Sequence, residues 1–139
     1  MGKTATATAV PEILVVDDEP QLCTALQRIL KMEGYHVRTA FDGQTALGLV
    51  KEKQPDAIVL DVVMPGMDGR EVCRRVRECA AGTRVIYFTA QSGAFQPQLL
   101  KELRQEADAF LTKPATSRQI VSQVSNVLAH GHLTLPQLS

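Results

Sequence analysis

Apolar residues occur in short runs that alternate with amphipathic stretches from Ile13 to Leu128. Three runs are continuous and rich in β-branched residues: 13–16, 57–60 and 85–88. Such runs are typical of strands that are buried on both faces of a sheet. The stretch 35–39 alternates apolar with polar residues, which predicts an edge strand with one wetter face, and 109–111 predicts a short fifth strand.

Between these runs the apolar positions follow the period of a helix. They predict three clear helices around 22–30, 72–80 and 120–128, and two weaker ones at 44–53 and 98–106. Pro20 suits the first turn of the first helix, and Ser117 is the predicted N-cap of the last one.

The order of these elements predicts a single α/β domain. Strands that alternate with helices favour a (βα)5 fold, a doubly wound parallel sheet with helices on both faces, and right-handed crossovers leave few topologies. The 139 residues are enough to bury one substantial core. We expect the domain at 12–129, an N-terminal tail at 1–11 and a C-terminal tail at 130–139.

The charge balance narrows the choice of partners. Fifteen basic residues balance fifteen acidic ones, so no overall field favours nucleic acid or an anionic membrane. No apolar run reaches membrane-spanning length, and the N-terminus lacks an apolar signal segment. We therefore expect a cytoplasmic protein. Its cysteines, Cys23, Cys73 and Cys79, lie in the helical patterns, which favours reduced core thiols over disulfides or a metal site.

Polar residues stand where four of the predicted strands end. Asp17 and Asp18 end the first strand, Asp61 the third and Thr89 the fourth, and Lys113 follows the fifth. The carboxyl ends of the strands in an open parallel sheet share one rim, where ligands bind. The sequence therefore predicts that three carboxylates, one hydroxyl and one ammonium group converge.

Three carboxylates at close range repel one another unless a cation is present. Mg²⁺ is the natural cation, because it binds one or two carboxylates, waters and phosphate oxygens, whereas Ca²⁺ normally takes more oxygen ligands. A carboxylate can also act as a nucleophile and form an aspartyl phosphate. Most of the catalysis would then be positioning and charge neutralisation.

Four short strings carry a family resemblance: DDEP at 17–20, DVVMPGMDG at 61–69, TA at 89–90 and KP at 113–114. Together, at these strand ends, they resemble the receiver domains of two-component response regulators. The resemblance implies a flavodoxin-like sheet with strand order 2-1-3-4-5. It also implies a signalling switch that catalyses its own phosphorylation and dephosphorylation, rather than an enzyme.

The resemblance assigns roles to the acidic residues. It makes Asp61 the phosphoacceptor and Asp18 a direct Mg²⁺ ligand, while Asp17 holds the ion mostly through water. The resemblance also implies that the main-chain carbonyl of Val63 is a further metal ligand. In such proteins the loop at 64–66 uses its glycine for unusual dihedral angles.

The resemblance also implies a switch. Lys113 pairs with Asp61 before transfer and with a phosphoryl oxygen afterwards, and a cis bond to the following proline aims this lysine. Thr89 moves to hydrogen-bond the phosphoryl group, and Phe110 then turns inward. The surface of the fourth helix, fifth strand and fifth helix changes as a result. Core packing is the alternative role of Phe110.

Two residues depart from the family pattern. Glu106 stands where receivers commonly have glycine at the end of the fourth helix, and a left-handed conformation there would cost about 1 kcal/mol. We therefore expect an altered helix end. Val63 cannot orient a water molecule by hydrogen bonding, which predicts slow autodephosphorylation, with Gln91 as a partial substitute.

Three other functions are compared with this one. An α/β phosphohydrolase would share the aspartyl intermediate, but it usually needs a second acid and a substrate-binding cap, and the sequence shows neither. A flavodoxin-like cofactor module is rejected, because 17–19 is acidic where a phosphate cradle has glycine and hydroxyl residues. A pure adaptor would not need the acidic set.

The expected partners are a histidine kinase or phosphotransfer protein, and a downstream protein or an effector domain outside this chain. Direct binding to nucleic acid or to a membrane is not expected, and pairing of two copies into a homodimer stays open. Arg70, Arg74 and Arg77 share one helical face. They could bind an anionic partner, but a solvated face is the stronger expectation.

Overall fold

The computed structural model describes residues 9–90 and 95–130. Its elements, in chain order, are β1 (Glu12–Val16), α2 (Pro20–Met32), β2 (His36–Ala40), α3 (Gly43–Glu52), β3 (Ala57–Leu60), α4 (Gly69–Cys79), β4 (Arg84–Thr89), α5 (Pro97–Glu106), β5 (Ala109–Thr112) and α6 (Ser117–His130). The strands form one parallel sheet in the order β2-β1-β3-β4-β5. The predicted (βα)5 architecture and the strand order 2-1-3-4-5 are confirmed.

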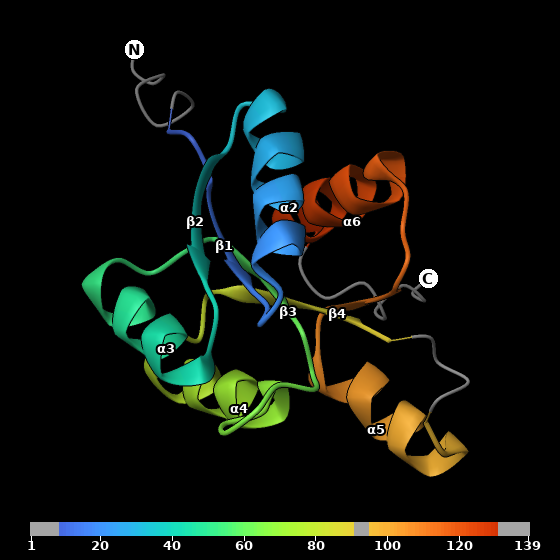
Figure 1. The fold of residues 1–139 in the computed structure, drawn as a ribbon. Helices are drawn as coiled ribbons and strands as arrows, with labels where there is room; N and C mark the ends of the chain where they lie inside the picture. The colour runs from blue at the N-terminus through green and yellow to red at the C-terminus, as the bar shows by residue number, and fades with distance from the viewer. Residues whose placement is uncertain (1–8, 91–94, 131–139) are drawn as a thin grey trace.

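Helices cover both faces of the sheet (Figure 1). Helices α2 and α6 pack on one face, and α3, α4 and α5 pack on the other. Successive strand residues point to opposite faces, so Leu14 and Val16 belong to one core while Ile13 and Val15 belong to the other. The central strands are apolar throughout because they supply side chains to both cores.

The edge strand differs from the central strands, as its alternating sequence predicts. In β2, Val37 and Ala40 are buried and His36 is exposed, whereas β3 is buried along its whole length. Pro20 occupies the first turn of α2, also as predicted.

The predicted N-cap of the last helix is wrong by one residue. Ser117 is the first residue of α6, and the capping contacts are made by Thr116. The Gln119 amide donates to Thr116 Oγ1 at 3.1 Å, and the Thr116 amide donates to Gln119 Oε1 at 2.8 Å. This reciprocal pair is a capping box.

The prediction of core thiols holds for two of the three cysteines. Cys23 and Cys73 are buried, but Cys79 is exposed. Cys79 is the last residue of α4, where the helical period no longer ensures that a side chain is covered.

The end of α5 departs from a glycine cap, as expected. The helix ends at Glu106, and Ala107 is extended, with φ −98° and ψ 161°. The chain thus leaves the helix without a left-handed residue, which only glycine adopts at low cost. Among the described residues, no helix is long and apolar enough to cross a membrane.

Candidate functional site

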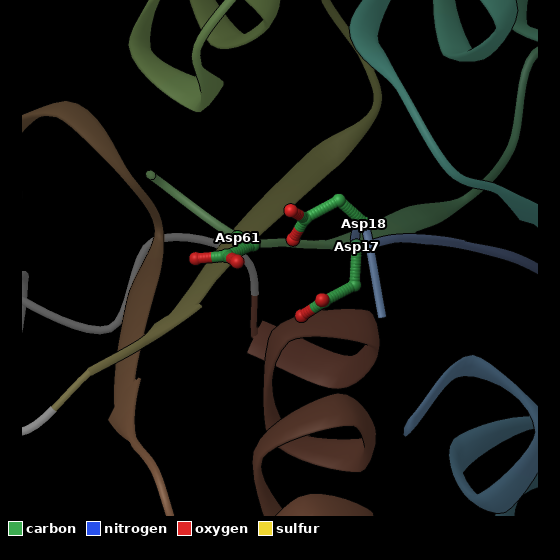
Figure 2. Close-up of side chains that lie close together, drawn as sticks. All are labelled: Asp17, Asp18 and Asp61. Atoms are coloured by element: carbon green, nitrogen blue, oxygen red, sulfur yellow. The ribbon is translucent and has the colours of Figure 1, made fainter. Parts of the chain in front are cut away.

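Three carboxylates meet at the carboxyl edge of the sheet. Oxygen atoms of Asp17, Asp18 and Asp61 lie within 4.8 Å of one another (Figure 2). Strands β1 and β3 are neighbours in register, Val16 opposite Leu60, so the residues that follow them are brought side by side. Asp17 and Asp61 are buried, and Asp18 is exposed. The predicted acidic cluster therefore forms.

Asp17 is held in place by two hydrogen bonds. Its Oδ1 accepts from the Glu19 amide at 3.0 Å, and its Oδ2 accepts from Lys113 Nζ at 2.8 Å. Burial raises the pKa of Asp17, although the bond with Lys113 acts in the opposite direction. The side chain is thus a carboxylate whose negative charge depends on nearby cations.

Lys113 lies between the carboxylates. Its Nζ is 2.8 Å from Asp17 Oδ2, 3.3 Å from Asp61 Oδ2 and 3.5 Å from Glu19 Oε1. Burial lowers the pKa of Lys113, but the hydrogen bond with Asp17 and the charge of Asp61 outweigh it and raise the pKa above its usual value. The Lys113–Pro114 peptide bond is cis, as predicted. The lysine is a fixed cation, and it lies closer to Asp17 than to Asp61.

The two carboxylate oxygens of Asp61 have different partners. Oδ1 accepts from Thr89 Oγ1 at 3.0 Å and from the Val63 amide at 3.2 Å, while Oδ2 faces Lys113. Thr89 is fully buried, with 0% of its surface exposed. All five side chains predicted to converge are therefore present in one site.

Gly69 shapes the loop that carries Asp61, and sequence reasoning gave it no role. Its amide donates to the Val62 carbonyl at 2.8 Å. A Cβ atom at Gly69 would lie 2.2 Å from the Asp61 carbonyl oxygen and 2.7 Å from Val62 Cα. The final glycine of DVVMPGMDG was the available signal. Gly66, in the predicted 64–66 loop, has a positive φ of 76°.

Two further predicted residues, Val63 and Phe110, differ in their exposure. Val63 is 60% exposed. Phe110 is half-buried and pairs in register with Tyr87, and Arg104 lies over its ring at 4.8 Å from the centroid. Gln91 lies outside the described residues.

The donor set fits a hard divalent cation. Three carboxylates offer only oxygen ligands, and one lysine offsets only part of their charge. Oxygen ligands of this kind suit Mg²⁺. The alternating fold, the 2-1-3-4-5 sheet and the acidic site at its carboxyl edge define the class: a flavodoxin-like α/β protein with a metal-competent acidic site.

Comparison with known proteins identifies the family. Residues 13–125 match the model of the response regulator receiver domain, and the chain belongs to this family. It is the receiver domain of a two-component response regulator, a signalling switch.

One relative is the alkaline phosphatase synthesis transcriptional regulatory protein PhoP of Bacillus subtilis. It is 39% identical over 125 residues, which cover 90% of this chain and 51% of that protein. The chain thus spans about half the length of this relative.

Solved structures agree in fold. TrrA of Thermotoga maritima, in complex with Mg²⁺-BeF, is 31% identical with a TM-score of 0.75, covering 85% of this chain and 99% of that one. The chemotaxis protein CheY4 of Vibrio cholerae is 29% identical with a TM-score of 0.78, covering 86% and 99%.

Proposed function

We propose that Asp61 accepts a phosphoryl group from a phosphohistidine of a histidine kinase or phosphotransfer protein, or from a small phosphodonor. One observation carries this proposal. The buried Asp61 carboxylate is the one that Thr89 and Lys113 both contact, beside the two aspartates that follow β1. Residues in this arrangement can position a nucleophile and neutralise charge.

The transfer is a displacement at phosphorus. An oxygen of Asp61 forms a bond to phosphorus while the phosphorus–nitrogen bond of phosphohistidine breaks, and the imidazole leaves with the electron pair. Lys113, already 3.3 Å from Asp61 Oδ2, then pairs with a phosphoryl oxygen. Thr89 transfers its hydrogen bond from Asp61 Oδ1 to the phosphoryl group.

The acidic cluster is the proposed Mg²⁺ site. We assign Asp18 and Asp61 as direct ligands, Asp17 as a ligand mostly through water, and the Val63 carbonyl as a main-chain ligand. Bound Mg²⁺ would neutralise the negative charge that accumulates around the phosphoryl group.

Signalling to a partner requires a surface that changes when Asp61 is phosphorylated. We assign the response to Thr89 and Phe110, and the changing surface to α5, β5 and α6, the fourth helix, fifth strand and fifth helix of the fold. The partner is a downstream protein or an effector domain outside this chain. We place the switch unit at 12–129 and in the cytoplasm, without direct contacts to nucleic acid or membrane.

Acetyl phosphate with Mg²⁺, followed by intact-mass measurement, tests the proposal. The wild-type chain is expected to gain the mass of one phosphoryl group, and Asp61→Asn is expected to gain none. Removal of Mg²⁺ by a chelator should abolish the adduct in the wild type. An adduct of equal yield in Asp61→Asn would show that another residue accepts the group.

Asp42→Asn is the matched control for loss of a carboxylate. Asp42 caps α3 through the Thr45 amide at 2.8 Å. Asparagine caps a helix about as well as aspartate. This variant should therefore be labelled as efficiently as the wild type.

A further inference from the structure

A second polar cluster lies between α4 and α5. It consists of Arg70 on α4, Tyr87 on β4 and Glu106 in the last turn of α5, and we call it the Glu106 cluster. Arg70 Nε donates to both carboxylate oxygens of Glu106, at 3.1 Å each, and Arg70 Nη2 also contacts Glu106. A guanidinium that contacts both oxygens of a carboxylate makes a strong, directional pair. The hydrogen bonds with Glu106 raise the pKa of Arg70 above the already high value of an ordinary arginine.

Tyr87 connects this ion pair to the centre of the sheet. Its side chain is fully buried, and its Oη donates a 2.9 Å hydrogen bond to Glu106 Oε1. Burial raises the pKa of Tyr87, so the hydroxyl keeps the proton that it donates. Glu106 thus accepts hydrogen bonds from two different elements at once.

Two arginines of α4 are not the solvated face that the sequence favours. Arg70 and Arg77 are only about one-third exposed, at 35% and 34%. Arg77 donates to the Glu106 carbonyl at 3.0 Å and to Asp108 Oδ2 at 3.2 Å. Arg74 is exposed and pairs with Glu71 on its own helix. All three arginines form ion pairs with carboxylates of the same chain, which argues against an anionic partner at this face.

Helix α5 has few buried apolar anchors, although the partly buried Leu99 also packs against the core. Leu103 is its only fully buried side chain, whereas α4 buries Gly69, Val72, Cys73 and Val76. A helix with so little apolar burial depends on polar contacts for its position. The Glu106 cluster supplies such contacts in the last turn of α5, and Arg70 Nη2 also donates to Glu102 at 3.1 Å one turn earlier.

Two residues of the Glu106 cluster, Arg70 and Tyr87, are close in sequence to residues of the candidate site. Arg70 directly follows Gly69, whose backbone lies against the backbone of Asp61. Tyr87 precedes Thr89 by two residues in β4, so both side chains point to the same face of the sheet. Thr89 in turn donates to Asp61.

We propose that Glu106 is a positioning residue: it holds α5 in the arrangement in which Thr89 hydrogen-bonds Asp61 itself, and so weakens the binding of a phosphoryl group. This inference rests on the proposed role of Asp61. Phosphoryl oxygens extend beyond the carboxylate, so Thr89 must be displaced to reach them, and the chain after Thr89 leads into α5. A contact that favours one arrangement lowers the affinity of any ligand that needs the other.

Beryllofluoride with Mg²⁺, a reversible mimic of the phosphoryl group, provides the test. Glu106→Gln removes one of the two negative charges that Arg70 pairs with and leaves the Arg70–Glu102 pair in place. Tyr87→Phe removes only a hydroxyl. Each variant is expected to bind the mimic about fivefold more tightly than the wild type, at the low end of allosteric couplings. The double variant should gain less than the product of the two effects, because both act through one cluster.

The affinity for the mimic distinguishes this role from a merely structural one. If the variants unfold at lower urea concentration and bind the mimic with unchanged or weaker affinity, the inference is overturned. Glu78→Gln, at an exposed position of α4, removes the same charge and should bind like the wild type. If the wild type binds the mimic in an Asp61-dependent way, the proposed function stands even when this inference fails. If the wild type does not bind it, both fail.

Discussion

The backbone of Gly69 lies so close to the backbone of Asp61 that a Cβ atom at Gly69 would be 2.2 Å from the Asp61 carbonyl oxygen. No side chain fits at this distance, because the atom it meets is main chain and cannot rotate away. The first turn of α4 is therefore in direct contact with the residue proposed to accept the phosphoryl group.

Gly69→Ala is expected to displace Asp61 and to slow labelling by acetyl phosphate at least tenfold, because small misplacements of reacting groups are costly. Overpacking should also cost about 1–3 kcal/mol of unfolding free energy. Intact-mass time courses and urea unfolding measure the two effects.

Gly48→Ala is the matched control for this substitution. A Cβ atom at Gly48 meets nothing within 4 Å, and the residue lies inside α3. Alanine should therefore raise the unfolding free energy by about 0.5–1 kcal/mol and leave labelling unchanged. Equal labelling of Gly69→Ala and the wild type would contradict the steric argument.

Lys113→Gln removes the cation that lies between Asp17 and Asp61. Without it, buried negative charges repel, and we expect the melting temperature to fall by roughly 5 °C or more, the effect of about 2 kcal/mol. Mg²⁺ should restore more stability to this variant than to the wild type, since the ion then supplies the missing positive charge.

Thermal unfolding with and without Mg²⁺ measures this difference. Lys51→Gln, at an exposed position of α3, is the control for loss of a lysine. An equal Mg²⁺-dependent gain in Lys113→Gln and the wild type would show that the lysine and the metal site are not coupled.

Much of this architecture could be predicted from the sequence, because the signals are local. Continuous apolar runs identified the doubly buried strands, and alternation identified the edge strand β2. Polar residues directly after the strands placed the acidic site at one edge. The sequence pattern predicted Ser117 as the N-cap, but the adjacent hydroxyl residue Thr116 makes the capping contacts.

The parts that could not be predicted depend on contacts between distant elements. Arg70 and Glu106 are separated by 36 residues, and neither the helical period nor composition pairs them. The role of Gly69 depends on the path of the loop against Asp61, which the sequence pattern does not specify. Cys79 fits the apolar stripe by spacing but ends its helix exposed.

The three cysteines should differ in reactivity. Cys79 is exposed, whereas Cys23 and Cys73 are buried. Burial raises the pKa of Cys23 to about 11 and also raises the pKa of Cys73. A raised pKa favours the thiol over the reactive thiolate, so at pH 8 both buried residues are protonated as well as shielded.

Iodoacetamide at pH 8 should therefore modify the native chain once, at Cys79, and modify all three cysteines in urea. Peptide mass mapping identifies the site. Cys79→Ser is the control, and it should remain unmodified when native. Alkylation of Cys23 at the same rate as Cys79 in the native chain would contradict the burial of Cys23.

The side chain of Val63 is expected to affect the lifetime of the phosphoryl group on Asp61. Its side chain is 60% exposed beside Asp61, and an isopropyl group cannot orient water by hydrogen bonding. Val63→Asn adds a group that can, and a net hydrogen bond of about 0.5–1.5 kcal/mol in the transition state corresponds to roughly two- to tenfold faster hydrolysis. Loss of the phosphoryl mass after removal of acetyl phosphate measures the rate. Val63→Ala is the control, because it changes size without adding a polar group and should not reproduce the acceleration. An unchanged or slower rate in Val63→Asn would refute the idea that this side chain limits hydrolysis.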